Sequence, residues 1–182
     1  MHKIDSKIKK NINIISGTLN DSYKVSKIFE PNTIDFLSQI SKEIFSKKKN
    51  LYFEDLATFA FWIRKKNLLK LADNYSQKDR MIGCGLALHI SPSNVPMNFA
   101  YSLVFGLLSG NNNIIRLPSK KYIQTEILIR IINKILKKKK FNNFKNKICL
   151  IKYNKSDEIS NYLSKLSDIR IIWGGDETIK KF

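Results

Sequence analysis

Acidic residues are few in this sequence: fifteen Asp and Glu stand against thirty-three Lys and Arg among 182 residues. The resulting formal net charge of +18 would attract nucleic acid, an anionic membrane or a polyanionic substrate. The basic residues are spread along the whole chain, however, and we expect most of them to form a solvated exterior. A dedicated nucleic-acid surface is therefore the less favoured interpretation.

Cysteine is scarce as well. Cys84 and Cys149 lie in separate apolar runs, so the sequence has neither a metal-ligand spacing nor a redox CxxC pair. We expect no metal site. Both cysteines are predicted to lie within strands as buried, reduced thiols that point into packed layers.

Long apolar runs and a cleavable leader are also missing. The first sixteen residues lack an apolar stretch followed by small residues, which argues against secretion. The least charged stretch, Met81 to Ile115, is interrupted by prolines and polar residues, so no run of about 20 apolar residues is available to span a bilayer. We expect a cytoplasmic protein.

The pattern of apolar residues predicts an α/β fold. The hydrophobic fraction of 43% is typical of a globular chain, and residues 1–80 show mostly helical spacing. From residue 81, short apolar runs alternate with helical ones, which is typical of βαβ units. We predict a Rossmann-like parallel sheet with flanking helices over residues 81–182, preceded by a mostly helical N-terminal segment over residues 1–80. The four predicted strands are Ile82–Ile90, Asn113–Leu117, Lys147–Tyr153 and Ile169–Trp173.

Two helical stretches between these strands help to decide whether the chain binds nucleic acid. Val95–Ser109 is apolar nearly all round and is predicted to be a buried helix. Its Phe105, like Trp173 on the fourth strand, is therefore expected to be buried rather than to stack on bases. The lysine run Lys137–Lys140 follows an amphipathic helix, where cations complement the helix dipole.

The loop after the first strand holds Asn94 between Pro92 and Pro96. Ligands of doubly wound sheets bind outside the carboxyl ends of the strands, which makes Asn94 a candidate functional residue. The local sequence equally allows Asn94 to cap the following helix. Both hypotheses stay open at this level.

Two further strand exits carry groups suited to phosphate. Arg116 lies at the carboxyl end of the second strand, shortly before Ser119, and its planar guanidinium could bind a phosphate or form a surface salt bridge. Gly174 and Gly175 follow the fourth strand and lead into a predicted helix, whose free N–H groups suit a phosphate. The GxGxxG fingerprint is absent.

Taken in order, these motifs resemble a known family. The segments that carry the resemblance are GLALHISPSNVPMNFAYSLVFGLLSGNNNIIRLPSK and IRIIWGGDETIKKF, within Gly83–Phe182. They are similar to the acyl-CoA reductase branch of the aldehyde dehydrogenase superfamily, to which the fatty-acyl reductase of bacterial luminescence belongs. The resemblance implies a domain that binds NAD or NADP, a second domain with a nucleophilic cysteine, and reduction of a cysteine-bound acyl group to an aldehyde.

The resemblance also implies roles for individual residues. Asn94 matches the asparagine that stabilises the oxyanion and is the expected catalytic residue. Arg116 takes the place of a lysine that contacts the adenosine ribose or its phosphate, and Gly174 with Gly175 match the turn that faces the pyrophosphate. No catalytic role is expected for Glu177.

Three more residues are expected to bind the cofactor. Ser91 and Pro92 belong to the first exit loop. Ser119 stands where many NAD-using relatives carry a glutamate that repels a 2′-phosphate, and Lys120 adds a cation beside Arg116. The sequence therefore predicts a preference for NADP(H) over NAD(H).

One departure from the family is large. The family's catalytic cysteine lies well downstream of the glycine turn, and this sequence ends eight residues after Gly174. We therefore expect the chain to be the cofactor-binding part of an acyl-CoA or other acyl-thioester reductase, with the cysteine outside it. Its expected partner is a complementary catalytic chain or further copies of itself. The alternatives are an aldehyde dehydrogenase or acyl-phosphate reductase of the same superfamily, and a non-catalytic nucleotide- or nucleic-acid-binding protein.

Overall fold

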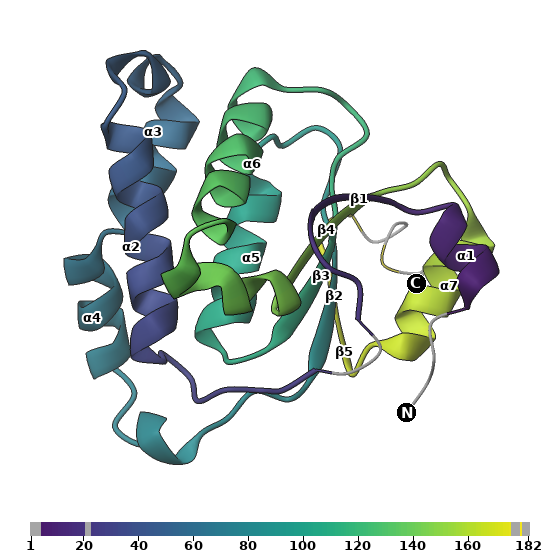
Figure 1. The fold of residues 1–182 in the computed structure, drawn as a ribbon, viewed down its shortest axis with the longest axis horizontal. Coiled ribbons are helices and arrows are strands. Elements are labelled where there is room, and N and C mark those ends of the chain that lie inside the picture. Colours follow the sequence, from purple (N-terminus) through teal and green to yellow (C-terminus); the bar gives the residue numbers. More distant parts are fainter. Residues whose placement is uncertain (1–4, 21–22, 176–178, 180–182) are drawn as a thin grey trace.

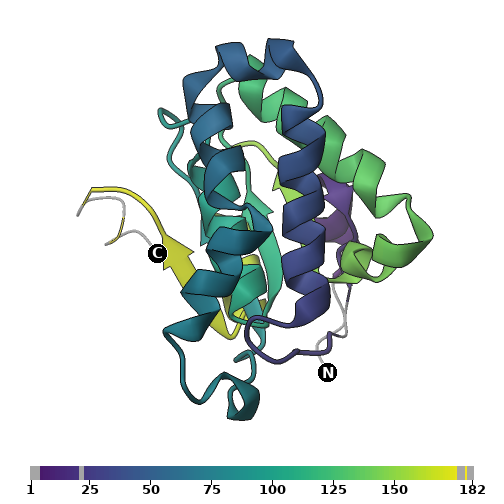
Figure 2. The ribbon, with the colours of Figure 1, turned by 90° about the vertical axis from the view of Figure 1, so that its left-hand side faces the viewer.

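The computed structural model describes residues 5–20, 23–175 and 179. It has a five-stranded sheet flanked by helices on both faces, with a helical N-terminal region on one side (Figure 1). Two helices, α1 and α7, cover one face; α5 and α6 cover the other, and α2, α3 and α4 lie outside them (Figures 1 and 2). The predicted α/β class is confirmed. The helices are α1 (Ser6–Lys10), α2 (Pro31–Phe45), α3 (Glu54–Trp62), α4 (Lys65–Asp73), α5 (Asn98–Leu108), α6 (Ile123–Leu136) and α7 (Asp157–Leu166), with 3₁₀ turns at η1 (Lys48–Tyr52), η2 (Lys78–Arg80) and η3 (Lys139–Asn146).

The sheet has the order β1-β4-β3-β2-β5. Its strands are β1 (Asn13–Gly17), β2 (Leu86–Ile90), β3 (Asn112–Arg116), β4 (Ile148–Lys152) and β5 (Ile169–Ile172). The strands β2 to β5 are all parallel, as predicted, and α5, α6 and α7 make the crossovers between them. Strand β1 pairs antiparallel with β4 and was not predicted. It is a five-residue edge strand with a single buried side chain, too short and too exposed to give a clear periodic signal.

Strand β2 begins four residues later than predicted, at Leu86. Gly85 has φ +141°, and a Cβ there would lie 2.1 Å from the Asp168 carboxylate. This backbone conformation favours glycine, and it ends the irregular segment that precedes the strand. Cys84 lies in that irregular segment and is exposed, so its predicted place inside a packed strand is wrong.

Two apolar cores lie on opposite faces of the sheet. On the α5–α6 face, Ile34 and Leu37 of α2 and Phe59 of α3 belong to the same core as the sheet residues Ile115 and Leu150. Burying side chains of this size stabilises the fold by about 1.5–3 kcal/mol each. The N-terminal helices therefore share a core with the sheet and its helices, and β1 completes one edge of that sheet.

Ion pairs tie the lysine run to α2. Glu43 accepts from Lys134 at 2.6 Å and from Lys138 at 3.1 Å, and Asp35 accepts from Lys140 at 2.8 Å. The hydrogen bond from Lys134 is the main reason that the pKa of Glu43 falls to about 2. Two of the four lysines of this run, Lys138 and Lys140, are thus paired with carboxylates of α2. Within the described residues, no helix is long and apolar enough to cross a membrane.

A cleft at the carboxyl edge of the sheet

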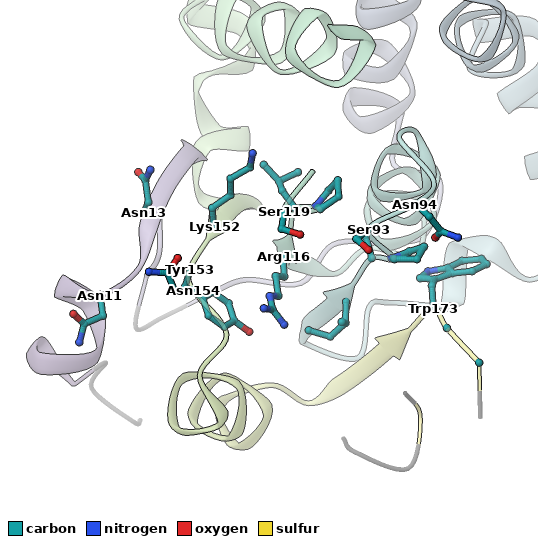
Figure 3. Close-up of a pocket in the computed structure, with 17 residues that line it drawn as sticks. Asn11, Asn13, Ser93, Asn94, Arg116, Ser119, Lys152, Tyr153, Asn154 and Trp173 are labelled. Carbon is teal, nitrogen blue, oxygen red and sulfur yellow. The ribbon is translucent and has the colours of Figure 1, made fainter. Parts of the chain in front are cut away.

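A cleft of about 870 Å³ lies where the parallel strands end, and loops after β2, β3, β4 and β5 line it (Figure 3). Its volume lies within the range of small-molecule sites. All seven residues that the sequence selects for the site line this cleft: Ser91, Pro92, Asn94, Arg116, Ser119, Gly174 and Gly175. They meet because the carboxyl ends of neighbouring parallel strands share one edge of the sheet.

The β2–α5 loop holds Asn94 at the cleft. The N-cap of α5 is Met97, three residues after Asn94, so the capping hypothesis is wrong. The Asn94 side chain is exposed, and no hydrogen bond within the described part of the chain engages its amide. The loop itself is anchored, because Thr125 Oγ1 donates to Pro96 O at 2.8 Å and Tyr122 Oη donates to Ser93 O at 3.0 Å. Asn94 is therefore an amide without an internal partner on a fixed backbone.

Two buried polar atoms of this loop region have no partner among the described residues. They are Ser91 Oγ, in the cleft wall, and Asn98 Oδ1, at the first residue of α5. A buried hydroxyl or amide without a hydrogen bond costs about 1–3 kcal/mol, so such groups are usually matched by a ligand or water. Ser91 therefore has the chemistry of a ligand contact.

The β3 exit supplies a cation to the middle of the cleft. The Arg116 guanidinium carbon lies 4.4 Å from the centroid of the Tyr153 ring, a cation–π geometry that leaves the fork's N–H donors accessible. Arg116 forms no ion pair with any described residue. The hypothesis that Arg116 forms a surface salt bridge is therefore wrong for the described part of the chain. Lys120 does not line the cleft. Its ammonium lies over the Tyr122 ring instead, 5.4 Å from the centroid.

Several lining residues were not anticipated from the sequence. Lys152 ends β4, and Tyr153 and Asn154 follow it; this fourth strand exit could have been selected by the same reasoning as the other three. Asn11 and Asn13 come from the α1–β1 segment. They reach the cleft because β1 is antiparallel: Asn13 pairs with Lys152, so the start of β1 lies at the end of β4.

The β5 exit forms the other end of the cleft. A Cβ at Gly175 would meet no atom of the described residues within 4 Å, so among them the space beside this turn is open. Trp173 lies just before the turn with 39% of its surface exposed, and Phe105 of α5 is 47% exposed. The expectation that both rings are buried is therefore wrong, because β5 is a half-covered edge strand and one side of α5 reaches solvent. Of the helix predicted after the turn, the structure describes Ile179, which is helical and donates its N–H to Gly175 O at 3.2 Å; Glu177 lies outside the described residues.

Neither cysteine lies at the cleft. Cys149 is buried in β4 as predicted, and burial raises the pKa of its thiol to about 12. Cys84 is exposed but precedes β2 at the amino end of the strand, roughly 20 Å from the β2 exit at about 3.3 Å per residue. No group of three or more His, Cys, Asp or Glu side chains in the described part of the chain could hold a metal ion.

The fold and the cleft define an α/β protein with a ligand-sized site at the carboxyl edge of its parallel strands. Comparison with protein families then places it more closely. Residues 63–182 match the family described as acyl-CoA reductase (LuxC), and the chain belongs to this family. The match includes β2 to β5 and every one of the seven site residues predicted from the sequence. Comparison with curated proteins gives no match.

Proposed function

We propose that residues 81–182 form the nucleotide-binding part of a nicotinamide-dependent acyl-CoA reductase, and that the mostly helical segment of residues 1–80 supports it. The observation that carries the proposal is the cleft, which gathers an amide, a cation, hydroxyls and a glycine turn at one edge of the sheet. Membership of the acyl-CoA reductase family supports an acyl-thioester substrate.

The lining residues fit a dinucleotide. Arg116 supplies a cation and Ser119 a hydroxyl at the β3 exit, a donor set suited to a ribose phosphate. The open space at Gly175 suits the close approach of a pyrophosphate, and the unpartnered Ser91 Oγ offers a further hydrogen bond. When bound, reduced nicotinamide supplies the hydride for the reduction.

Asn94 contributes to the chemistry through its side-chain amide. As a nucleophile adds to the thioester carbon, the carbonyl oxygen gains negative charge, and an amide N–H on a fixed loop stabilises it without reorganisation. Donors of this kind are worth about 3–4 kcal/mol of barrier lowering. The loop anchors at Ser93 and Pro96 hold the backbone from which this amide projects.

The nucleophilic cysteine of this mechanism is proposed to lie outside these 182 residues. Cys149 is buried with a raised thiol pKa, and Cys84 precedes the amino end of β2, away from the cleft. A complementary catalytic segment would supply the cysteine. The proposal is tested by titrating the chain with NADPH, then adding a cysteine-bearing catalytic segment and measuring acyl-CoA-dependent aldehyde formation. Absence of NADPH binding at moderate salt would contradict it.

Cofactor selectivity gives the first prediction. The chain should bind NADPH more tightly than NADH, because Arg116 and the neutral Ser119 favour a 2′-phosphate. Ser119→Glu should weaken NADPH binding by about tenfold and change NADH binding little, since juxtaposed like charges are unfavourable. Calorimetric titration of both cofactors checks this. The matched control is Ser76→Glu, which adds the same charge at an exposed serine away from the cleft. Equal losses in both variants would argue against a phosphate site at Ser119.

The two thiols should differ in reactivity. A thiol reagent should label the exposed Cys84 in the native chain, whereas Cys149 should react only after unfolding, because the thiolate is the reactive form and burial disfavours it. Labelled chain should bind NADPH as well as unlabelled chain does. Peptide mass mapping identifies the labelled site, and loss of NADPH binding on Cys84 labelling would contradict the placement of this residue away from the cleft.

A further inference from the structure

A chain of buried hydrogen bonds runs between the sheet and α5 and ends at the cleft. His89, in β2, is fully buried, and its Nδ1 lies 2.6 Å from Ser102 Oγ of α5. On the other side of the ring, Nε2 lies 3.0 Å from Asn113 Oδ1 of β3. Ser102 Oγ also accepts the indole N–H of Trp173 at 3.1 Å. Asn113, His89 and Ser102 are each at most 2% exposed, whereas Trp173 reaches the cleft.

The hydrogen bonds allow one arrangement of protons. Asn113 Nδ2 donates to the carbonyls of Asn111 and Lys147, so its Oδ1 faces the imidazole and can only accept. His89 Nε2 must therefore carry the proton, which leaves Nδ1 to accept from the Ser102 hydroxyl. Ser102 in turn accepts from Trp173. The hydrogen bonds therefore all run the same way: the indole donates to Ser102, Ser102 donates to His89, and His89 donates to Asn113. Burial keeps the imidazole neutral by lowering its pKa to about 4.

A glycine of α5 makes room for this network. Gly106 lies one turn after Ser102, and a Cβ there would stand 1.9 Å from Asn113 Oδ1 and 3.0 Å from His89 Cε1. Glycine inside a helix costs about 0.5–1 kcal/mol relative to alanine. Here it lets the helix approach the sheet closely enough for Ser102 to reach the imidazole. The close contact between α5 and the sheet is therefore what allows this hydrogen-bond network to form.

The indole at the end of the network is a wall of the cleft. Figure 3 shows Trp173 at the same end of the cleft as Asn94, with Asn11 and Asn13 at the far end. The Trp173 backbone is fixed by its N–H bond to Ile90 O at 3.0 Å, while the bond to Ser102 fixes its half-exposed ring. Without that bond, a partly solvated indole could occupy other rotamers.

We propose that His89 and Ser102 are positioning residues that lock the Trp173 indole in the cleft wall beside Asn94 and thereby tighten cofactor binding. The effect on cofactor binding rests on the proposed function. The locking of the ring does not, because it is a property of the chain without ligand. The two parts can therefore be measured separately.

The test uses the full chain with Trp62→Phe, which leaves Trp173 as the single tryptophan, since the sequence has two. Ser102→Ala should raise the acrylamide quenching of Trp173 fluorescence about twofold. It should also weaken NADPH binding, measured by calorimetry, about fivefold, the scale of one neutral hydrogen bond. The matched control is Ser41→Ala, which removes an equally buried hydroxyl that donates to Ala60 O at 2.7 Å in the α2–α3 contact. It should change neither readout.

A second comparison covers the case in which Ser102→Ala fails to fold. Trp173→Phe removes the N–H donor and keeps an aromatic ring, so it should weaken NADPH binding to a similar extent. When Ser102→Ala is combined with Trp173→Phe in a chain that folds, it should weaken NADPH binding little further. Equal quenching of Trp173 in the Ser102→Ala and Ser41→Ala chains would overturn the proposal, whatever the cofactor does. If the parent chain binds no NADPH, the proposed function fails, and the quenching comparison alone decides whether the ring is locked.

Discussion

Replacing Asn94 by alanine should lower the turnover of the complete reductase by one to three orders of magnitude, the range seen when an oxyanion donor is removed. NADPH binding and folding should change little. The structural reason is that the Asn94 side chain is exposed, makes no hydrogen bond within the described residues and is not the N-cap of α5. Its loss therefore leaves no buried group unpaired.

The measurement is aldehyde formation at saturating acyl-CoA and NADPH, together with urea unfolding of the same preparations. Asn143→Ala provides the control, because Asn143 is also exposed but lies in η3, before the amino end of β4 and away from the cleft. It should leave turnover and unfolding unchanged. A loss of several kcal/mol in the free energy of unfolding of Asn94→Ala, or an unaltered rate, would show that the amide has no role in stabilising the oxyanion.

The cleft residues could be selected from sequence because of a topological rule. Consecutive parallel strands place their carboxyl ends at one edge, so Asn94, Arg116 and Gly174 meet there although up to 80 residues separate them. The same rule did not reveal Asn11 and Asn13. They lie at this edge only because β1 runs antiparallel to β4. The apolar pattern of a five-residue edge strand is too weak to predict the direction in which the strand runs.

The buried network lay beyond sequence reasoning for a different reason. His89 stands in an apolar run, where its partner could have been any polar group on a covering helix. Its contacts depend on the approach of α5 to the sheet, which Gly106 sets, and on the side-chain rotamers of Ser102 and Asn113. Such pairs join residues on separate elements, and neither spacing nor composition encodes them. The exposure of Cys84 was missed because the strand was predicted from Ile82, whereas β2 begins only after Gly85.

The stability of the protein should fall by about 3 kcal/mol as the pH is lowered from about 6.5 to about 4, owing to His89. Burial is the main cause of its pKa of about 4, against an ordinary value of 6.5. Above pH 6.5 the ring is neutral in both the folded and the unfolded chain, so stability is unaffected. Between the two pKa values only the unfolded chain binds the proton, which favours unfolding. A difference of about 2.5 between the pKa values corresponds to about 3 kcal/mol.

Urea unfolding at pH 7, 5.5 and 4.5 measures this dependence. His89→Gln should be less stable at pH 7, because the amide cannot fully replace the ring, but its stability should change far less over this range. His2→Gln, which removes the other histidine, should retain the parent slope. Asp35 and Glu43 titrate mainly below this window, since hydrogen bonds from lysines hold their folded pKa values at about 2; the stability that they give is lost as the pH falls from their ordinary values near 4. A parent slope that survives His89→Gln would assign the pH dependence to other groups and would mean that the imidazole is not held neutral by its burial.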